Sequence, residues 1–364
     1  MNVLNDKGIK ALRPLLGTIY KFNIPFKSAL KLFQTLILPI LLYNTENWNI
    51  ISDTFLNKLN KDNFFSWILN SKTDTTHRKL LKNILGVTKT CPDVAVYGET
   101  GEFPLSLKGL RITLNFWYRV TNLPESTLAK KALLENISIR SNWIKTIEKL
   151  IGILDLSDKI ENPKKFNICT KNALENGFTE HWKNSLNDPG NSRLQFYRKL
   201  KNHFETKKYL ECTNFHQRRS LTKLKCSDHT LEIEKGRHRK IPRKDRKCFF
   251  CPTDTIEDEE HFLFYCPKFE HIRREFGIQA TVPLHNVFQD DFDKLAKFTN
   301  KAFEYRKEEI GKKYERVGFL GDFSSCHIFV LFLAARSASI AIMQDYSLCY
   351  LCLFSVVLSF LKCK

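Results

Sequence analysis

Three cysteines and one histidine lie within CFFCPTDTIEDEEHFLFYC, the segment from Cys248 to Cys266, with the spacing C-x2-C-x9-H-x4-C. Zinc prefers four thiolate or imidazole ligands in a tetrahedron, and a tight turn lets a C-x2-C pair place two thiolates on one ion. The aromatic residues around them also suit a buried hydrophobic segment, but a small zinc module needs such a core too. We therefore predict a Zn²⁺ site with the ligands Cys248, Cys251, His261 and Cys266.

The chain carries eleven cysteines, and its first residues, MNVLNDKGIK, lack the apolar stretch of a secretory signal. We expect an intracellular protein, in the nucleus or cytoplasm, with reduced cysteines. Cys226 and His229 form either a second metal half-site or an ordinary turn, and we favour the turn. The acidic run 257–260 could bind Mg²⁺ or do acid–base chemistry, but a solvated turn that offsets nearby basic charge is the preferred interpretation.

Basic residues gather directly before the predicted ligands. The formal net charge is +19, and residues 193–247 contain 18 Lys and Arg against 6 Asp and Glu. Such clustering favours a polyanionic partner, which we expect to be RNA or DNA, with aromatic side chains of the zinc module stacking on unpaired bases. The predicted phosphate contacts are Arg218, Arg219, Lys223, Lys225, Arg237, Arg239, Lys240, Arg243, Lys244, Arg246 and Lys247.

Apolar periodicity predicts a mainly α-helical fold. Residues 8–90 are expected to be helical, with a break near Pro39 and a C-cap at Gly86. Further helices are expected in LSLKGLRITLNFWYRV, NWIKTIEKLIGIL, RLQFYRKLKNHF and DFDKLAKFTNKAF. The Pro- and Gly-rich segment Val87–Leu105 is expected to be an ordered loop, LEIE (Leu231–Glu234) a short strand, and Asp291 a helix N-cap.

The last forty residues are strongly apolar, but their two apolar runs are each shorter than the roughly 20 residues that cross a bilayer as a helix. A buried or surface-lying hairpin and a tail without a selected role are both compatible with this pattern. A membrane-associated protein, anchored by this tail with its basic run on anionic lipid, is therefore the alternative to nucleic-acid binding.

Three blocks of the sequence resemble the C-terminal part of the second open reading frame of non-LTR (LINE-type) retrotransposons. Leu32–Trp48 is similar to the reverse transcriptase thumb, Leu80–Val120 to the segment that follows it, and Arg218–Phe276 contains the family's terminal Cys/His module. The resemblance runs from about residue 8 to 276. With the composition it divides the chain into a thumb-like helical region (1–72), a helical connection (73–215), a basic zinc-knuckle-like module (216–276), an amphipathic helix (277–310) and an unmatched apolar tail (311–364).

The resemblance implies binding of the element's RNA and of its target DNA. It implies no catalysis by this chain, because the sequence lacks the Tyr/Phe-x-Asp-Asp element with which the family's polymerase holds Mg²⁺, and the endonuclease domain is absent. Asp290 and Asp291 follow the zinc module instead of lying in a palm. We therefore expect a nucleic-acid-binding remnant without enzymatic activity, with a non-functional fragment as a further alternative.

Overall fold

The computed structural model of the chain describes residues 2–47, 51, 53–160, 163–211, 214–252, 254–279, 288 and 292–318. The chain divides into two compact units, Met1–Phe303 and Glu304–Lys364. Everything discussed below belongs to the first unit, apart from the C-terminal end of the last helix.

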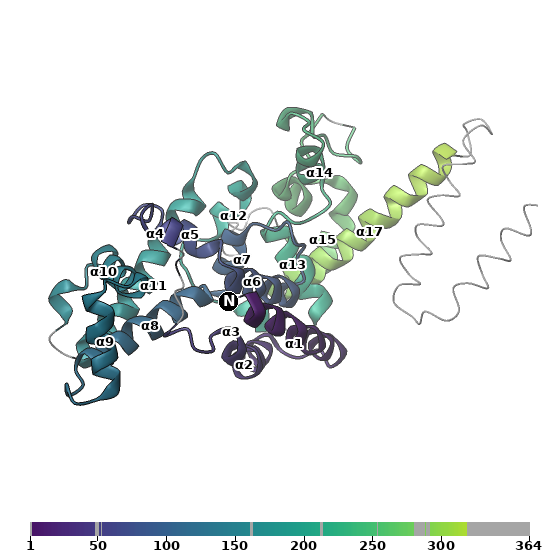
Figure 1. Cartoon of the computed structure of the whole chain (residues 1–364). Helices are drawn as coiled ribbons and strands as arrows, with labels where there is room; N and C mark the ends of the chain where they lie inside the picture. The colour runs from purple at the N-terminus through teal and green to yellow at the C-terminus, as the bar shows by residue number, and fades with distance from the viewer. Residues whose placement is uncertain are drawn as a thin grey trace, which may run out of the picture. The chain divides into compact units, whose positions relative to one another are not determined.

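The mainly α-helical fold is confirmed, and the described residues contain no β-strand (Figure 1). The helices are α1 (Asn2–Lys21), α2 (Phe26–Leu36), α3 (Leu38–Leu41), α4 (Asp53–Leu56), α5 (Phe64–Leu69), α6 (Lys72–Leu85), α7 (Asp93–Thr100), α8 (Leu105–Thr121), α9 (Leu128–Ser138), α10 (Asn142–Ile153), α11 (Pro163–Asn187), α12 (Gln195–Leu200), α13 (Phe215–Lys225), α14 (Glu232–His238), α15 (Glu270–Phe276) and α17 (Phe292–Gly318).

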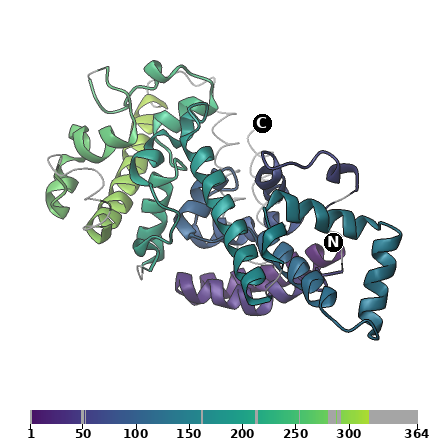
Figure 2. The ribbon, with the colours of Figure 1, turned by 90° about the vertical axis from the view of Figure 1, so that its left-hand side faces the viewer.

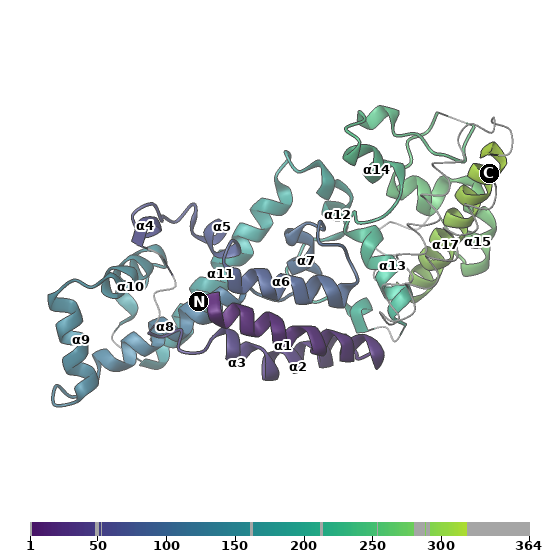
Figure 3. The ribbon, with the colours of Figure 1, turned by 45° about the vertical axis from the view of Figure 1, so that its right-hand side comes forward.

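Within the first unit, α9 and α10 lie at one end and α14 and α15 at the other (Figure 3). Figure 2 shows the same separation from another side, with the purple N-terminal helices between the two ends. Helix α6 packs against α1, α7 and α8, and the long helix α11 packs against α7 and α8. The core between them is apolar and aromatic, with Leu80, Tyr97, Leu110 and Trp182 almost completely buried.

Two predicted helix boundaries are confirmed. Helix α2 ends at Leu36 and α3 begins at Leu38, so the break lies at Ile37, two residues before Pro39, which occupies the first turn of α3. Gly86 ends α6 in the left-handed conformation, with φ 71°. A Cβ at this position would come within 2.6 Å of the Arg219 side chain, so glycine suits both the backbone and the packing.

The prediction of a loop over Val87–Leu105 is wrong in the centre of this segment, where helix α7 forms. Pro92 precedes α7 and Gly101 ends it in the left-handed conformation, so these residues mark the ends of a short helix. Tyr97 is buried in α7, and the carbonyl oxygen of Val94 accepts the indole N–H of Trp182 from α11 at 2.8 Å. Tertiary packing therefore stabilises a helix too short to be evident from periodicity.

The helix expected in RLQFYRKLKNHF is shorter than predicted, because α12 ends at Leu200 and Lys201 is extended. The buried ammonium of Lys201 donates to the carbonyl oxygen of Glu205 at 2.7 Å. The following segment then bonds to the end of α7: Lys207 N–H donates to Glu99 and the Thr206 hydroxyl to Thr100. These contacts replace the helical hydrogen bonds that a longer α12 would make.

The strand expected at Leu231–Glu234 is also wrong, because this segment begins helix α14. Two backbone N–H groups of its first turn are satisfied by one residue. Glu232 N–H donates to the Glu257 carboxylate at 2.7 Å, and Ile233 N–H donates to the Glu257 carbonyl oxygen at 3.1 Å. A distant carboxylate therefore fixes this helix start, which local alternation does not reveal.

The other predicted helices are confirmed as α8, α10 and α17. Helix α17 continues past the expected boundary at residue 311 to Gly318. The expected N-cap Asp291 and residues 319–364 of the apolar tail lie outside the described residues. In the described part of the chain, no helix combines the length and apolarity needed to cross a membrane. The other domain boundaries stay predictions.

Candidate metal centre

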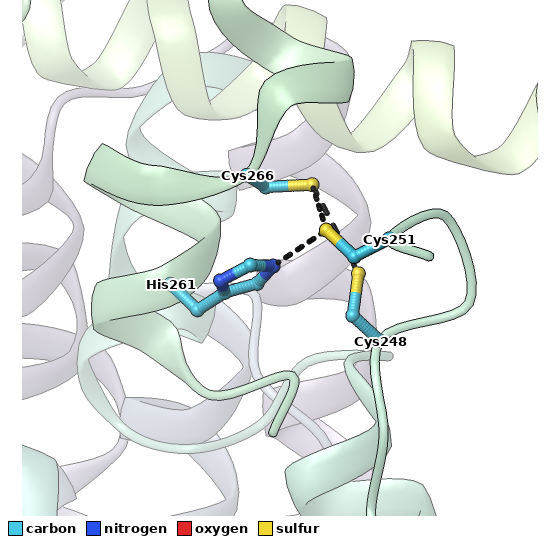
Figure 4. Close-up of side chains that lie close together, drawn as sticks. All are labelled: Cys248, Cys251, His261 and Cys266. Atoms are coloured by element: carbon cyan, nitrogen blue, oxygen red, sulfur yellow. Dashed lines mark hydrogen bonds between the residues drawn. The ribbon is translucent and has the colours of Figure 1, made fainter. Parts of the chain in front are cut away.

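The structure brings the four predicted ligands together (Figure 4). Their ligand atoms all lie within 4.8 Å of one another. The Cys266 sulfur lies 3.9 Å from that of Cys248 and 3.7 Å from that of Cys251, and the Cys251 sulfur lies 3.3 Å from Nε2 of His261. Three ligands are buried and Cys251 is partly exposed.

These distances match the edges of a zinc tetrahedron. With Zn–S of about 2.3 Å and Zn–N of about 2.0–2.1 Å, sulfur–sulfur edges are about 3.8 Å and sulfur–nitrogen edges about 3.6 Å. A disulfide would instead need sulfurs about 2.05 Å apart, and all three cysteines are free. The Cys3His group can therefore hold a metal ion such as zinc.

A hairpin-like loop supplies the first two ligands. Lys247 and Ile256 form an isolated antiparallel β-bridge, beside which Cys248 N–H donates to Thr255 at 2.8 Å and Glu257 N–H donates to Arg246 at 2.9 Å. The chain must reverse between these residues, and this turn places the Cys248 and Cys251 sulfurs on the same side. The C-x2-C spacing thus acts as the sequence analysis predicted.

A π-helical turn, His261–Tyr265, supplies the other two ligands. The Asp258 carboxylate accepts the His261 N–H at 2.9 Å and fixes the start of the turn. At its other end Cys266 N–H donates to the His261 carbonyl oxygen at 2.8 Å, and Arg273 from α15 donates to the Cys266 carbonyl oxygen at 2.6 Å. One residue that is not itself a ligand therefore holds the backbone of each of these ligands, Asp258 that of His261 and Arg273 that of Cys266.

The aromatic residues of the motif form a small core beside the ligands. Phe262 and Phe269 are almost fully buried, with ring centroids 4.9 Å apart, and Phe262 stacks on Phe303 of α17 at 4.7 Å. The segment is thus both a buried hydrophobic core and a candidate metal centre. Tyr265, 61% exposed, is the aromatic side chain of this segment most accessible to a partner.

The pKa values of the three thiols are shifted in different directions. The hydrogen bond from Cys266 lowers the pKa of the Cys248 thiol to about 3, although burial opposes this, and His261 adds to the lowering. The hydrogen bond to Cys248 and burial raise the pKa of Cys266, and burial raises the pKa of Cys251. A divalent ion must displace the remaining thiol protons, so metal affinity is expected to fall at low pH.

The acidic run 257–260 is not the solvated turn that we expected, because Glu257 and Glu259 are almost fully buried. Glu257 holds the start of α14 and Asp258 that of the π-helical turn, as described above. Glu259 accepts hydrogen bonds from Ser227 and His229, and Glu260 pairs with Lys199. These carboxylates therefore join the metal loop to α12, α13 and α14.

Cys226 and His229 do not form a second metal site within the described residues. Nε2 of His229 lies 3.1 Å from a carboxylate oxygen of Glu259, and its ring stacks on Phe303. Cys226 is buried next to Cys91, whose hydrogen bond, together with burial, raises the pKa of the Cys226 thiol. The preferred interpretation of Cys226 and His229 as non-metal residues agrees with these contacts.

Two of the predicted phosphate contacts are buried and serve the fold. The ammonium of Lys225 lies 2.6 Å from the buried Glu99 carboxylate. Arg218 lies over the Phe215 ring and donates to the carbonyl oxygen of Leu210 at 3.1 Å. The structure therefore contradicts their assignment to an exposed phosphate-binding surface, because neither charge faces solvent at the basic run.

Three further predicted contacts are bound to the fold or partly withdrawn from solvent. Arg246 donates to the carbonyl oxygens of Ile233 and Ile241, and Arg219 to that of Gly86. Lys223 is half-buried, and burial lowers its pKa. Of the remaining six, Arg237 lies in the last turn of α14 and the other five lie between α14 and the first ligand. Four pair with carboxylates, Arg237 with Glu234, Arg239 with Glu232, Arg243 with Asp258 and Lys247 with Asp254.

Lys240 and Lys244 are exposed, with no ion pair to another described residue.

The sequence did not predict Asp258 and Arg273, the residues that orient His261 and Cys266. An aspartate three residues before a helical turn is a capping signal that could have identified Asp258.

Comparisons with protein-family models, curated proteins and solved structures found no match to this chain.

Proposed function

We propose that the chain binds single-stranded nucleic acid through its basic loop, residues 239–247, which a zinc-bound Cys3His module holds in place. One observation carries the proposal: the loop joins the end of α14 to the first metal ligand and is fixed at both ends. Ile241 N–H donates to Gly236 at one end, and the Lys247–Ile256 bridge holds the other. Exposed Arg243 and Lys244 lie between these anchors, and exposed Lys240 directly precedes the first.

The basic loop suits a polyanion because its cations are exposed and weakly held. Arg243 is 47% exposed and 3.5 Å from its partner Asp258, a distance and exposure at which an ion pair is worth about 0–1 kcal/mol. A phosphate can therefore replace Asp258 at small cost. Lys and Arg contacts of this kind release counterions from nucleic acid and make binding salt-dependent.

The resemblance to LINE-type retrotransposon proteins supports the same proposal. In such an element, RNA and target DNA are the partners that this region would bind, and polymerisation needs the paired aspartates of a palm that the sequence lacks. We therefore propose a nucleic-acid-binding protein that does not itself extend a primer. Primer extension by the purified chain would contradict this part of the proposal.

The test is fluorescence anisotropy of the full chain with a labelled single-stranded RNA at several salt concentrations. The triple variant Lys240→Gln, Arg243→Gln and Lys244→Gln should bind more weakly, and its salt slope should fall by about 2, since each single-strand phosphate contributes about 0.7. The matched control changes three exposed lysines on other helices to Gln: Lys131, Lys145 and Lys183. Equal affinity and slope for the loop variant and the wild type would refute the basic-loop proposal.

A further inference from the structure

A cavity of about 460 Å³ lies between the C-terminal end of α1 and the N-terminal end of α13. Its walls include Ile19, Tyr20, Ile84, Phe215, His216 and Arg218. Helix α6 packs against both helices and supplies Ile84, so a single helix supports both sides of the cavity. The volume falls in the range of roughly 300–1,000 Å³ that is typical of small-ligand sites.

Two aromatic rings form the stacking surface of this cavity. Tyr20 and Phe215 meet edge to face, with centroids 5.7 Å apart and planes at 80°. The Tyr20 hydroxyl donates to the carbonyl oxygen of Asn83 at 2.8 Å, so the ring is held in place while 45% of the residue stays exposed. A partly exposed aromatic ring that is fixed by its own hydrogen bond loses little entropy when a planar group stacks on it.

Basic residues line the cavity, and acidic residues do not. Arg218, whose guanidinium lies 5.5 Å from the Phe215 ring centroid, and the exposed His216 line it, and no carboxylate does. Burial raises the pKa of the Tyr20 phenol, and the nearby charge of Arg219 partly opposes this. The environment is therefore apolar and aromatic, with positive but no negative charge at its wall.

A second cavity, of about 120 Å³, lies beside the basic loop and differs in this respect. Five basic side chains line it, those of Arg193, Lys199, Arg237, Arg243 and Arg246, but so do four carboxylates, those of Glu234, Asp258, Glu259 and Glu260. An anionic ligand inside this cavity would meet repulsion from these four carboxylates. The observations therefore favour the α1–α13 cavity as the place where an anionic, aromatic group binds.

We propose that the α1–α13 cavity stacks one unpaired base of a single-stranded nucleic acid on the ring of Tyr20, with the nearly perpendicular ring of Phe215 against the edge of the base. Arg218 lies behind Phe215 and is held by the carbonyl oxygen of Leu210, and no carboxylate lines the cavity to repel the neighbouring phosphate. Base–aromatic stacking of this kind tolerates any sequence, because every base has a π-face. The inference rests on the proposed function and adds a second contact on the strand, distinct from the basic loop.

The experiment measures anisotropy of the full chain with two labelled oligonucleotides of equal length, oligothymidine and an oligomer of abasic residues. Tyr20→Leu and Phe215→Leu should each weaken oligothymidine binding about five- to one-hundred-fold, the range expected for one lost stack. Binding of the abasic oligomer, which keeps the phosphates and lacks bases, should be unchanged. Tyr20→Phe keeps the ring and should bind oligothymidine like the wild type.

Tyr43→Leu is the matched control, because Tyr43 is 67% exposed and does not line the cavity. Phe215→Leu keeps the Tyr20–Asn83 hydrogen bond, so it tests the site even where Tyr20→Leu alters the fold. Wild-type affinity in both variants, or equal losses on both oligonucleotides, would overturn the base-stacking site and leave the basic loop standing. If the wild type binds neither oligonucleotide, the proposed function fails, and the stacking site with it.

Discussion

The metal module and the helical body of the first unit bury polar groups in different ways. In the module, residues 239–276, the buried polar groups are three metal ligands and the side chains of Glu257, Glu259 and Arg273. In the body, long helices bury apolar side chains around ion pairs such as Glu99 with Lys225. The body therefore contains its own charge partners, whereas the three cysteines and the histidine of the module need a bound cation to hold them together.

The Glu99–Lys225 pair shows how the body supplies a partner for a buried charge. The Lys225 ammonium and the Tyr209 hydroxyl each lie 2.6 Å from the same carboxylate oxygen of Glu99. Burial alone would raise the pKa of Glu99, but Lys225 and Lys201 outweigh it, so the pKa is lowered. The body should consequently fold without metal, and the module should not.

The largest expected effect is that of metal removal. Structural zinc contributes about 10–16 kcal/mol in small zinc modules at neutral pH. A chelator should therefore abolish amide protection in residues 248–276 while α6, α8 and α11 remain protected, as measured by hydrogen exchange with mass spectrometry. Cys266→Ser should reproduce the loss without chelator, whereas Cys169→Ser, outside the cluster, should not. Uniform loss of protection in both regions would contradict this division.

A smaller loss is expected from breaking the buried ion pair of the body. Lys225→Met leaves Glu99 buried without its cation, which typically costs about 3–5 kcal/mol of the free energy of unfolding. Urea denaturation measures this loss, and zinc content should stay unchanged. The double variant Glu99→Leu and Lys225→Met should regain much of the stability.

Lys199→Met is the control for this prediction. Its partner Glu260 and Lys199 itself are partly exposed, so the loss should be about 0–1 kcal/mol. Equal losses for Lys225→Met and Lys199→Met would show that burial does not distinguish the two pairs.

The smallest effect is a pH dependence of the body that comes from His77. Burial lowers the pKa of His77 to about 3 from its usual 6.5. Between these values only the unfolded chain binds the proton, so the stability contribution is full above pH 6.5 and is lost as the pH falls. From pH 7 to pH 5 the loss should be about 2 kcal/mol.

His77→Phe should remove this share of the pH dependence, because the phenylalanine side chain does not titrate. The variant should keep its packing, since Phe can keep the stacking on Phe33, whose ring centroid lies 5.6 Å from that of His77. The exposed control His271→Gln should retain it. Urea denaturation at pH 7 and pH 5 decides between them, and an unchanged difference in His77→Phe would refute the assignment.

Patterns of neighbouring residues in the sequence predicted the metal cluster and most of the longer helices. The ligand spacing predicted the metal cluster, and apolar periodicity predicted α8, α10 and the start of α17, because both depend on neighbouring residues. The errors depend on distant partners. Helix α14 begins on Glu257, α12 is cut short beside α7, and Lys225 is turned inward by Glu99, a residue 126 positions away. A pattern in a single sequence cannot predict such long-range contacts. A lysine is therefore assigned to a basic surface unless the carboxylate that pairs with it in the fold is known.

The most direct test of the central claim is the metal content of the purified full chain, measured by native mass spectrometry for the wild type and for Cys266→Ser. Three thiolates and one imidazole at tetrahedral-edge distances predict one zinc ion per chain in the wild type and its loss in the variant. A wild-type chain without zinc after expression in zinc-supplemented medium, or a Cys266→Ser chain that keeps one zinc ion as firmly as the wild type, would contradict the metal centre and the module built on it.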